Sequence, residues 1–403
     1  MFDSPPIIVG LEIGTSKVVA LVGEINDAGV LSLVGIGQAT SRGVRKGEIV
    51  DLNLAAEDVR AAIVEAEQSA DVEISSVFLG VTGAHIQGVT NRGMHPIVSV
   101  DREITEEDVQ LVVNNAKLVQ IPPQNVIVHG VRQAFIVDGK PGIPNPVKML
   151  GSRLEVDVHV VHGNNNRMQN ATRVVENLQL QVDGYAFNGL ASALSTLDNE
   201  DKEMGALVID LGGGVTDFVV YSSGVVKHTG VLAVGGDHLA NDLAFGLKVP
   251  LGRAEKLKTE HGCAVLREDL KGQSLTLTND HGLPVKTVNL EHLNCILALR
   301  VEEIFQLIEA DLAQAGLLDH VRRGVFLTGG GARMPQIQQA AEQVFQLPAV
   351  VGRANSISGI KSTLDQPEFA TAIGLVKYGS FQQKRRKGLM EAFKDKIEGL
   401  IRI

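Results

Sequence analysis

The 403-residue sequence contains no tryptophan, and aromatic residues make up only 4% of it. Its two cysteines, Cys263 and Cys295, have no metal-ligand spacing beside them, which excludes a disulfide scaffold and predicts two reduced thiols. No apolar run approaches the roughly 20 residues that a membrane-spanning helix needs. Residues 1–6 also lack the basic start of an export signal. We therefore expect a soluble protein that is not exported.

Positively charged residues are also fewer than negatively charged ones. The chain has 37 Lys and Arg against 47 Asp and Glu, a formal net charge of -10. This balance disfavours nucleic acid as a partner, and any contact with an anionic membrane must be local. The length, with 44% hydrophobic residues, exceeds the roughly 250–300 residues at which a single core stops growing. Two or more lobes are therefore expected.

Two segments far apart in the chain share one plan. In residues 7–22 and again in 206–220, an apolar strand ends near an acidic residue, glycine follows two residues later, and a second apolar strand returns. Each segment continues through a tight turn into a third strand, which predicts two three-stranded meanders. A repeat at this distance indicates a duplicated domain with a site between its halves.

Hydrophobic periodicity predicts the elements around these repeats. A helix over 104–119 with strands over 126–137 and 154–161 predicts a small, separate α+β module. The later elements are expected as helices over 165–180, 189–197, 236–246, 251–261 and 290–315 and as strands near Tyr185 and over 274–278, 285–288 and 324–328.

The turn of the first repeat has a composition suited to phosphate. After Glu12 come Gly14, Thr15, Ser16 and Lys17. Backbone N–H groups in such a turn can converge on an anion, because glycine has no Cβ to block the approach. Taken alone, the pattern also fits an ordinary hairpin turn.

The second repeat strengthens the phosphate interpretation. Its turn contains Asp210, Gly212, Gly213, Gly214 and Thr216. Three consecutive glycines cost backbone entropy, which argues against a mere surface turn and favours a second phosphate-binding hairpin facing the first. Glu12 and Asp210 suit the water ligands of Mg²⁺, which keeps several waters in proteins. A pair of structural carboxylates is the alternative.

Two further features suit a nucleoside. Gly329, Gly330, Gly331 and Arg333 follow a predicted strand and are expected to open a helix, as a backbone surface against which a nucleoside lies flat. Close packing at a helix N-terminus is the alternative. Glu255 and Lys258 are three residues apart on a predicted helix, so they share one face and could bracket a ribose and base. By themselves they would be a solvated charge pair.

The order of these elements resembles the phosphate-one, phosphate-two and adenosine motifs of the actin, Hsp70 and sugar-kinase superfamily, over nearly the whole chain. Within it, the sequence is most similar to the FtsA family of bacterial cell-division proteins. The resemblance rests on residues 10–17, 208–214, 254–258, 261–264, 325–330 and 371–375. Residues 189–193 and 369–378 resemble the two interdomain connecting helices, which are expected to form a hinge.

The resemblance implies an α/β, two-lobed actin-like fold, a duplicated RNase H-like fold, with ATP and Mg²⁺ between the lobes. It adds an inserted small α+β subdomain and a C-terminal amphipathic helix. The expected divisions are a first lobe over 1–83 (1A), the inserted subdomain over 84–163 (1C), the first lobe continued over 164–200, a second lobe over 201–365 (2A, with 2B at about 237–315), a return helix over 366–381, a basic linker over 382–388 and a membrane-targeting helix over 389–403.

Glu12 departs from the aspartate that is usual in the actin-type motif. One extra methylene moves the carboxylate outward by about 1.5 Å, enough to disturb a strict octahedral Mg²⁺ arrangement. We therefore expect ATP binding with at most slow hydrolysis, and we assign no catalytic residue.

The C-terminal end is both basic and amphipathic. Its basic residues are Lys384, Arg385, Arg386 and Lys387, and helical periodicity then places Leu389, Met390, Phe393, Ile397, Leu400 and Ile401 on one apolar arc. Residues 384–403 contain seven Lys and Arg and three Asp and Glu, a local net charge of +4. This pattern favours an anionic membrane surface, with polymerisation adding avidity. A terminal helix docked on the protein body is the alternative.

The family resemblance implies a role in division. The expected protein is peripheral, forms head-to-tail filaments on the cytoplasmic face of the bacterial inner membrane at midcell, and anchors FtsZ filaments of the Z ring there. Later division proteins would be recruited or activated through 84–163. The FtsZ tail is expected on the helix carrying Arg300 and Glu303, where a solvated helix face is the alternative. Rival interpretations are an MreB-like or pilus-assembly actin homologue and a small-molecule kinase of the same superfamily.

Overall fold

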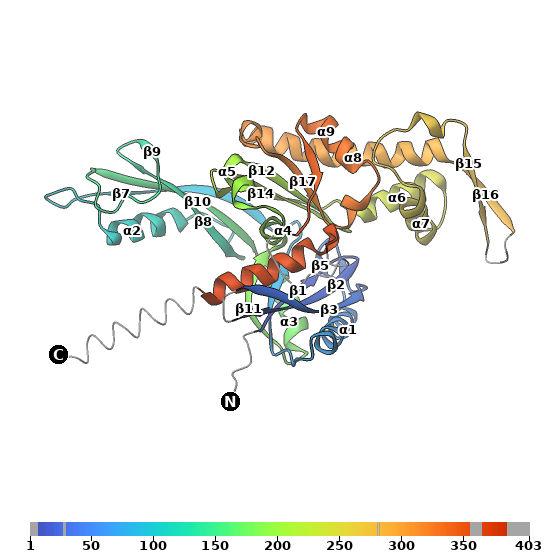
Figure 1. Cartoon of the computed structure of the whole chain (residues 1–403), viewed down its shortest axis with the longest axis horizontal. Coiled ribbons are helices and arrows are strands. Elements are labelled where there is room, and N and C mark those ends of the chain that lie inside the picture. Colours follow the sequence, from blue (N-terminus) through green and yellow to red (C-terminus); the bar gives the residue numbers. More distant parts are fainter. Residues whose placement is uncertain (1–6, 27–29, 280, 282, 355–364, 385–403) are drawn as a thin grey trace.

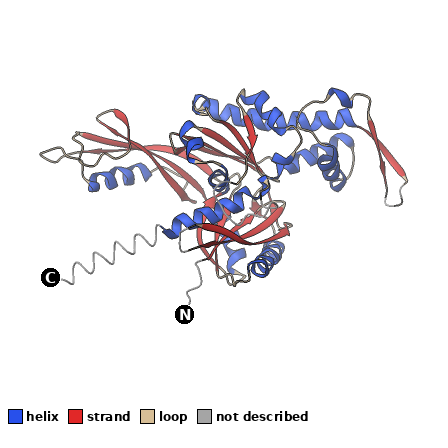
Figure 2. Ribbon diagram, in the orientation of Figure 1, coloured by secondary structure: helices blue, strands red, loops and turns tan. Residues whose placement is uncertain are grey.

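The computed structural model describes residues 7–26, 30–279, 281, 283–354 and 365–384. Two lobes, each built on a five-stranded sheet, lie against each other, and a smaller sheet and a two-stranded hairpin project at opposite ends (Figure 1). Helices cover both faces of the two large sheets (Figure 2). The predicted two-lobed α/β organisation with an additional α+β module is confirmed.

The first lobe contains a sheet with strand order β11-β6-β1-β2-β3. Its strands are β1 (Ile7–Ile13), β2 (Lys17–Ile25), β3 (Leu31–Thr40), β6 (Ser76–Val81) and β11 (Gln181–Phe187). The first three form the predicted antiparallel meander, and β6 and β11 add to it in parallel. Helices α1 (Leu52–Ala70) and α3 (Asn165–Glu176) pack on one face and a helix over 370–384 on the other. Central strands are mostly apolar because both faces are covered.

The second lobe repeats this plan with strand order β14-β13-β12-β17-β18. Its strands are β12 (Ala206–Leu211), β13 (Thr216–Ser222), β14 (Val225–Leu232), β17 (Gly324–Thr328) and β18 (Ala349–Val351). An antiparallel meander is again followed by two parallel strands, which confirms the predicted duplication. Helices α8 (Leu290–Gln314) and α9 (Ile337–Phe345) cover one face, and α4 (Asn188–Thr196) packs on the other.

The remaining elements of the two lobes are shorter. They are β4 (Val44–Arg45), β5 (Glu48–Ile49), α5 (Asn199–Met204), α6 (Gly236–Leu247), α7 (Leu251–His261), β15 (Ser274–Thr278) and β16 (Pro284–Asn289), with 3-10 helices η1 (Glu268–Leu270), η2 (Leu318–His320), η3 (Gly330–Arg333) and η4 (Pro367–Phe369). Helices α6 and α7 pack beside one end of α8, and the β15–β16 hairpin projects beyond them (Figure 1).

The α+β module has a four-stranded sheet with order β7-β10-β8-β9. Its elements are β7 (Gln87–Pro96), α2 (Glu106–Lys117), β8 (Asn125–Val137), β9 (Lys140–Ile143) and β10 (Arg153–Asn164). Thr105 caps α2 in a reciprocal arrangement with Asp108, a pairing that satisfies two backbone donors at the helix start. The module has its own apolar core between α2 and the sheet.

Several boundaries differ from those predicted. Helix α3 ends at Glu176 instead of 180, because Gln179 takes a left-handed backbone conformation (φ 62°) as the chain turns into β11. The helix beginning at 370 continues to 384 and so includes the first residues of the predicted basic linker. The elements that were not predicted are helices α1 and α5 and strands β4, β5, β6, β7, β9 and β18. None of the helices within the described parts of the chain is long and apolar enough to cross a membrane.

The two lobes meet at the crossing of α4 and the 370–384 helix, the two predicted connecting helices (Figure 1). A Cβ added to Gly374 would lie 1.7 Å from the carbonyl oxygen of Ala191. The glycine therefore sets the closeness of this crossing, which lies directly behind the space between the lobes.

Candidate functional site

One cavity of about 670 Å³ lies between the lobes, within the range that small-molecule sites occupy. Most of the residues predicted for a nucleotide site line it. They are Glu12, Gly14, Thr15, Ser16, Lys17, Asp210, Gly212, Gly213, Glu255, Lys258, Gly329, Gly330, Gly331 and Arg333. Segments separated by about 300 residues of sequence thus converge on one space.

Gly214 and Thr216 do not line this cavity. A Cβ on Gly214 would lie 2.5 Å from Thr15 Oγ1, so the glycine permits close packing of the second turn on the first lobe. Thr216 is fully buried and donates to the carbonyl oxygen of Val234 at 2.8 Å. Both residues help to shape the turn, and neither faces the cavity.

The first turn joins β1 to β2. The backbone N–H of Gly14 donates to the carbonyl oxygen of Lys17 at 3.0 Å, and a Cβ on Gly14 would lie 2.8 Å from that oxygen. Thr15 Oγ1 accepts from the backbone N–H of Gly47 at 3.0 Å. Glycine is therefore required for the tightness of the turn, and the threonine fastens it to the following hairpin.

The second turn joins β12 to β13 and faces the first. An added Cβ on Gly213 would lie 3.3 Å from the Cβ of Ser16, which places the two turns opposite each other, as predicted. The carbonyl oxygens of Gly212 and Gly213 accept from the first two N–H groups of α6, at 3.0 and 2.7 Å. The turn is therefore held from behind by the start of that helix.

Lys17 supplies positive charge at the first turn. Its Nζ donates to the carbonyl oxygen of Glu368 at 2.6 Å and lies 4.3 Å from the centre of the Phe369 ring. Burial lowers the pKa of Lys17, although the nearby Glu12, Glu368 and Asp210 oppose this effect. A bound polyanion at the turn would restore the preference for the charged ammonium.

Three carboxyl groups gather at the inner end of the cavity. Burial raises the pKa of Glu12 to about 7, with Lys17 opposing and Asp210 adding to the rise. Burial also raises the pKa of Asp210, against the effect of hydroxyl donors from Ser192 and Thr371, the latter at 2.7 Å. A cation placed among these groups would favour their ionised forms.

Asp217 is the third carboxyl and lies across the strand pair from Asp210. Burial raises its pKa well above the usual range, and Asp210 and Glu12 add to that rise. The hydroxyl of Thr82, on the first lobe, donates to Asp217 Oδ1 at 2.5 Å. This hydrogen bond links the two lobes at the floor of the cavity.

The other end of the cavity is glycine-rich and more apolar. Gly329 has φ +79°, and a Cβ added to Gly330 would meet no atom within 4 Å among the described residues. The cavity's apolar lining includes Leu239, Val301, Ile304, Met334 and Ile337. A flat heterocycle could therefore lie against the backbone of the 329–331 segment. The segment opens the 3-10 helix η3, and α9 begins only at 337.

Glu255 and Lys258 border this end from α7. Lys258 Nζ lies 2.7 Å from Glu255 Oε2 and donates to the carbonyl oxygen of Gly236 at 2.9 Å. The predicted shared helix face is therefore confirmed. On the opposite side, Arg333 Nη1 pairs with Glu368 Oε1 at 2.7 Å, which joins the glycine segment to η4.

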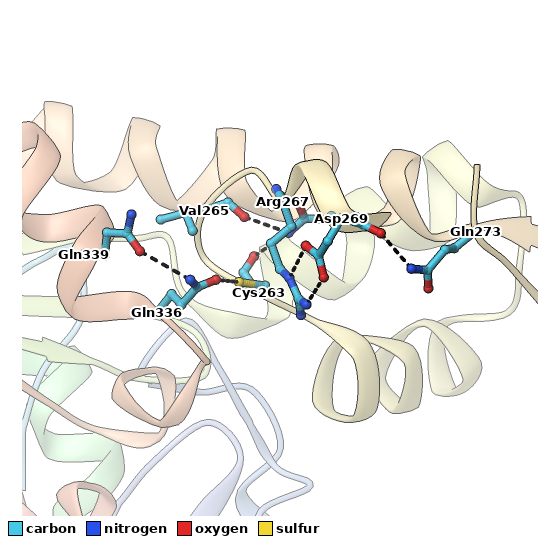
Figure 3. A network of polar contacts seen from close by, with 8 residues as sticks. Cys263, Val265, Arg267, Asp269, Gln273, Gln336 and Gln339 are labelled. Carbon is cyan, nitrogen blue, oxygen red and sulfur yellow. Dashed lines mark hydrogen bonds and ion pairs between the residues drawn. The ribbon is translucent and has the colours of Figure 1, made fainter. Parts of the chain in front are cut away.

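A polar network joins the loop after α7 to Gln336, which follows the glycine segment in the chain (Figure 3). Cys263 Sγ donates to Gln336 Oε1 at 2.7 Å, and the backbone N–H of Ala264 donates to the carbonyl oxygen of Pro335 at 2.9 Å. Gln336 itself has a left-handed backbone (φ 59°). The buried cysteine thus joins the loop after α7 to Gln336, which lies between the cavity-lining residues Pro335 and Ile337, and this structural role is consistent with the reduced thiol predicted for it.

Several lining residues were not assigned from the sequence. They include Thr82, Asn188, Asp217, Asp237, Thr259, Glu368 and Thr371. Asp217 and Thr371 lie inside motifs that the sequence displays, so their spacing was a usable signal. Thr82 follows strand β6 and Asn188 follows strand β11, where nothing local marks them.

The arrangement fits an elongated polyanion with a flat apolar end. Glu12 Oε2 is buried without a hydrogen-bond partner among the described residues, and together with Asp210 it offers oxygen acceptors for the hydration shell of a hard cation. Within the described chain, no group of three His, Cys, Asp or Glu residues could hold a metal by itself. Cation binding here would therefore depend on water and on the bound anion, which suits Mg²⁺ with a nucleotide.

The other predicted binding residues lie apart from the cavity. Arg300 donates to Asp242 Oδ2 at 2.6 Å and also pairs with Glu303, on the outer faces of α8 and α6. The predicted membrane residues Arg385, Arg386, Lys387, Leu389, Met390, Phe393, Ile397, Leu400 and Ile401 lie outside the described residues. Lys384 is the last residue of the 370–384 helix.

Comparison with protein families gives two matches. The family Cell division protein FtsA matches residues 207–374, and the family SHS2 domain inserted in FTSA matches residues 83–162. Cell division protein FtsA of Pseudomonas aeruginosa is 36% identical over 388 residues, 96% of this chain and 92% of that protein. The protein of the same name from Escherichia coli K12 is 36% identical over 380 residues, 93% of this chain and 90% of that protein.

Solved structures share the fold at much lower identity. A chain of the PilM–PilN type IV pilus biogenesis complex has a TM-score of 0.63 at 15% identity and covers 93% of this chain and 98% of that one. MreB5 of Spiroplasma citri bound to ADP has a TM-score of 0.57 at 16% identity, over 94% and 98% of the two chains. These similarities establish the predicted actin-like fold. At such low sequence identity they show the fold alone.

Proposed function

The chain belongs to the FtsA family of cell-division proteins, and from that premise we propose that it binds ATP with Mg²⁺ between its lobes and polymerises on the cytoplasmic face of the bacterial inner membrane. There it anchors FtsZ filaments at midcell and recruits or activates later division proteins. The observation that carries this proposal is the cavity in which two glycine-containing turns, one from each repeat, face each other beside buried carboxyl groups.

Each part of the cavity has a task in this proposal. The phosphates lie between the turn at Gly14–Lys17 and the turn at Gly212–Gly213, where backbone N–H groups can converge. The base and ribose lie against Gly329–Gly331 and between Glu255, Lys258 and Arg333. The ADP-bound state named for the MreB5 structure supports a nucleotide in this position.

Glu12 and Asp210 would hold Mg²⁺ through its water ligands. Bound there, the cation supplies positive charge that neutralises the phosphates and polarises them toward attack. The chain's own residues bind and orient the nucleotide, and the connecting helices at the 374–191 crossing form the hinge about which the lobes close. The long Glu12 side chain and the absence of an assigned base favour slow turnover, so the nucleotide acts mainly as a switch for assembly.

Head-to-tail assembly and the membrane tail act together. The basic residues 384–387 and the apolar arc from Leu389 to Ile401 provide one weak anionic-membrane anchor per subunit, and a filament multiplies it. The inserted module over 84–163 has its own core and also contacts β14 of the second lobe through Gln133 and His159. Its projecting end suits contact with a neighbouring subunit and with later division proteins.

We propose the outer surface of α6 and α8 as the FtsZ-tail site. Arg300 and Glu303 lie there, and Phe245 is 88% exposed three residues after Asp242, the partner of Arg300. A large exposed aromatic beside charged groups is typical of a peptide-binding surface. Replacing Phe245 by serine should weaken binding of the FtsZ C-terminal peptide about tenfold or more in a fluorescence anisotropy titration. Unchanged affinity would place the FtsZ site elsewhere.

Vesicle sedimentation tests the proposed function. The full chain and a chain ending at Gln383 are pelleted with vesicles of anionic lipid, with ATP, with ADP and without nucleotide. ATP-enhanced pelleting of the full chain alone, with filaments visible on the lipid, is the expected outcome. Equal pelleting of the two chains would refute the membrane tail, and indifference to nucleotide would refute the switch.

A further inference from the structure

The cavity contains a carboxyl group that neither the phosphate turns nor the proposed Mg²⁺ position uses. Glu368 belongs to η4 and lines the cavity, and its side chain is only 14% exposed. Its Oε1 pairs with Arg333, and its Oε2 is buried with no hydrogen-bond partner among the described residues. A buried acceptor that lacks a donor destabilises a fold. This oxygen would therefore gain from a ligand that brings a donor to it.

Glu368 lies between the two ends of the cavity. Its backbone carbonyl oxygen accepts from Lys17 Nζ, at the phosphate turn, at 2.6 Å. Its side chain accepts from Arg333 Nη1 at 2.7 Å, beside the segment proposed for the nucleoside. The preceding residue is tied to the same segment, because the carbonyl oxygen of Pro367 accepts from the N–H of Gly329 at 2.9 Å. In a nucleotide, the ribose joins the phosphates to the base. A nucleotide bound along the cavity would therefore bring its ribose nearest to Glu368.

The charges around Glu368 make a carboxylate compatible with a bound polyanion. Lys17 lies on one side of the residue and Arg333 on the other. Burial lowers the pKa of Lys17, and Glu368 is among the acidic groups that oppose this effect. A carboxylate without cationic neighbours would repel the phosphates of a nucleotide. Between these two cations, the carboxylate can accept a hydrogen bond from the ligand without that penalty.

Few groups of a nucleotide can donate a hydrogen bond to this oxygen. Ionised phosphates are acceptors only, so the donors are the ribose hydroxyls and, in adenine, the 6-amino group. The position between the phosphate turn and the glycine segment favours the ribose. Carboxylates suit this task, since an acidic residue binds the ribose 2′-hydroxyl in many dinucleotide-binding folds. Because Oε1 is engaged by Arg333, Oε2 is left to accept from one hydroxyl.

Resting on the proposed function, we infer that Glu368 makes the site specific for ribonucleotides. Its Oε2 accepts a hydrogen bond from a ribose hydroxyl, and Arg333 holds the carboxylate in position. A deoxynucleotide that lacks this hydroxyl leaves the oxygen buried without a donor, so it binds more weakly. Glu368 and Arg333 are 35 residues apart in the chain, which explains why no local sequence pattern identifies the pair.

The test compares two variants of the full chain, Glu368→Ala and Glu368→Met, with the wild type. Alanine removes the carboxyl group, and methionine removes it while keeping a side chain of similar length. The control is Glu73→Ala, because Glu73 is exposed in the loop before β6 and does not line the cavity. Isothermal titration in Mg²⁺ measures the affinity of each protein for ATP, 2′-dATP, 3′-dATP and purine riboside triphosphate, which lacks only the 6-amino group of ATP.

The wild type and Glu73→Ala should bind ATP roughly 10- to 100-fold more tightly than at least one of the two deoxynucleotides. In both Glu368 variants this preference should fall to within about twofold, because the acceptor is gone. The preference is a ratio within each protein, so any change in phosphate attraction by the unpaired Arg333 affects all nucleotides alike and cancels. The ratio between ATP and purine riboside triphosphate should be the same in all four proteins, because both nucleotides keep the ribose hydroxyls.

Three outcomes overturn the inference alone. The first is equal binding of ATP and both deoxynucleotides by the wild type, and the second is a preference for ATP that survives in both Glu368 variants. The third is a wild-type preference for ATP over purine riboside triphosphate that both variants lose, which would place Glu368 at the base. If the wild-type chain bound no ATP, the proposed function itself would fail.

Discussion

The ionisation of Glu12 should make the stability of the nucleotide-free protein fall as pH rises. Burial raises the pKa of this carboxyl from 4.5 to about 7 in the folded state. Below pH 4.5 the group is protonated in both states and has no effect. Between the two pKa values the unfolded chain ionises while the folded chain does not, so the free energy of unfolding decreases with pH, and above pH 7 the loss is complete.

The size of this effect follows from the two pKa values. At 1.36 kcal/mol for each pKa unit, the full loss is about 3 kcal/mol, of which about 2.5 kcal/mol falls between pH 5 and 8. The variant Glu12→Gln lacks this ionisation and should not lose that stability. For a chain of 403 residues, its melting temperature should therefore gain roughly 3 °C on that of the wild type as the pH goes from 5 to 8.

Thermal melts monitored by circular dichroism in EDTA, without nucleotide, measure the difference. Both proteins share every other titrating group, so the difference between their curves isolates Glu12. Glu73→Gln is the control, because Glu73 is exposed in the loop before β6, and it should track the wild type. If the melting temperatures of the wild type and Glu12→Gln changed in parallel across this pH range, burial would not raise the pKa of Glu12, and the reasoning would be refuted.

Three further predictions concern the frame around the site. Thr82→Val removes the hydroxyl that links the lobes through Asp217 and should lower the free energy of unfolding by about 1–3 kcal/mol in urea titrations; no change would mean that the link is not made in solution. Gly374→Ala should sharply reduce the yield of folded protein, because its Cβ would meet the α4 backbone at 1.7 Å, whereas Gly252→Ala, whose Cβ meets no atom of the described part of the chain within 4 Å, should not. Thr105→Ala should speed amide exchange in α2 by about fivefold, reflecting a cap of about 1 kcal/mol; unchanged exchange would refute the capping role.

Much of the fold could be predicted from the sequence because each repeat is a local pattern. The strand-turn-strand plan of residues 7–22 and 206–220 contains its own turn chemistry, so both meanders were predicted. The same holds for α2, where Thr105 and Asp108 form the start signal within four residues. Strand β7 was missed because seven of its ten residues are polar or glycine. It is held in place by pairing with β10, a long-range contact that no local pattern reveals.

The site was predicted in part for the same reason. The glycine-rich turns can be recognised in the sequence. Three successive glycines do not reveal which of them faces the cavity, however, and Gly214 packs against Thr15 instead. Thr82 follows strand β6 and Asn188 follows strand β11, and only the folded chain brings these two polar residues together with Asp217. The membrane tail lies beyond the described residues and stays a prediction.

Isothermal titration of Mg²⁺ and ATP into the wild type, Gly330→Val and Gly252→Val tests the central claim most directly. Gly330 lines the cavity, and an added Cβ would meet no atom of the described residues within 4 Å; Gly252 on α7 is equally unobstructed by them but does not line the cavity. Both variants should therefore fold, and valine at 330 should occupy the space proposed for the nucleoside. The account predicts that Gly330→Val loses at least about tenfold in ATP affinity, roughly 1.4 kcal/mol, while Gly252→Val binds like the wild type. Equal ATP binding by all three proteins, or none by the wild type, would contradict it.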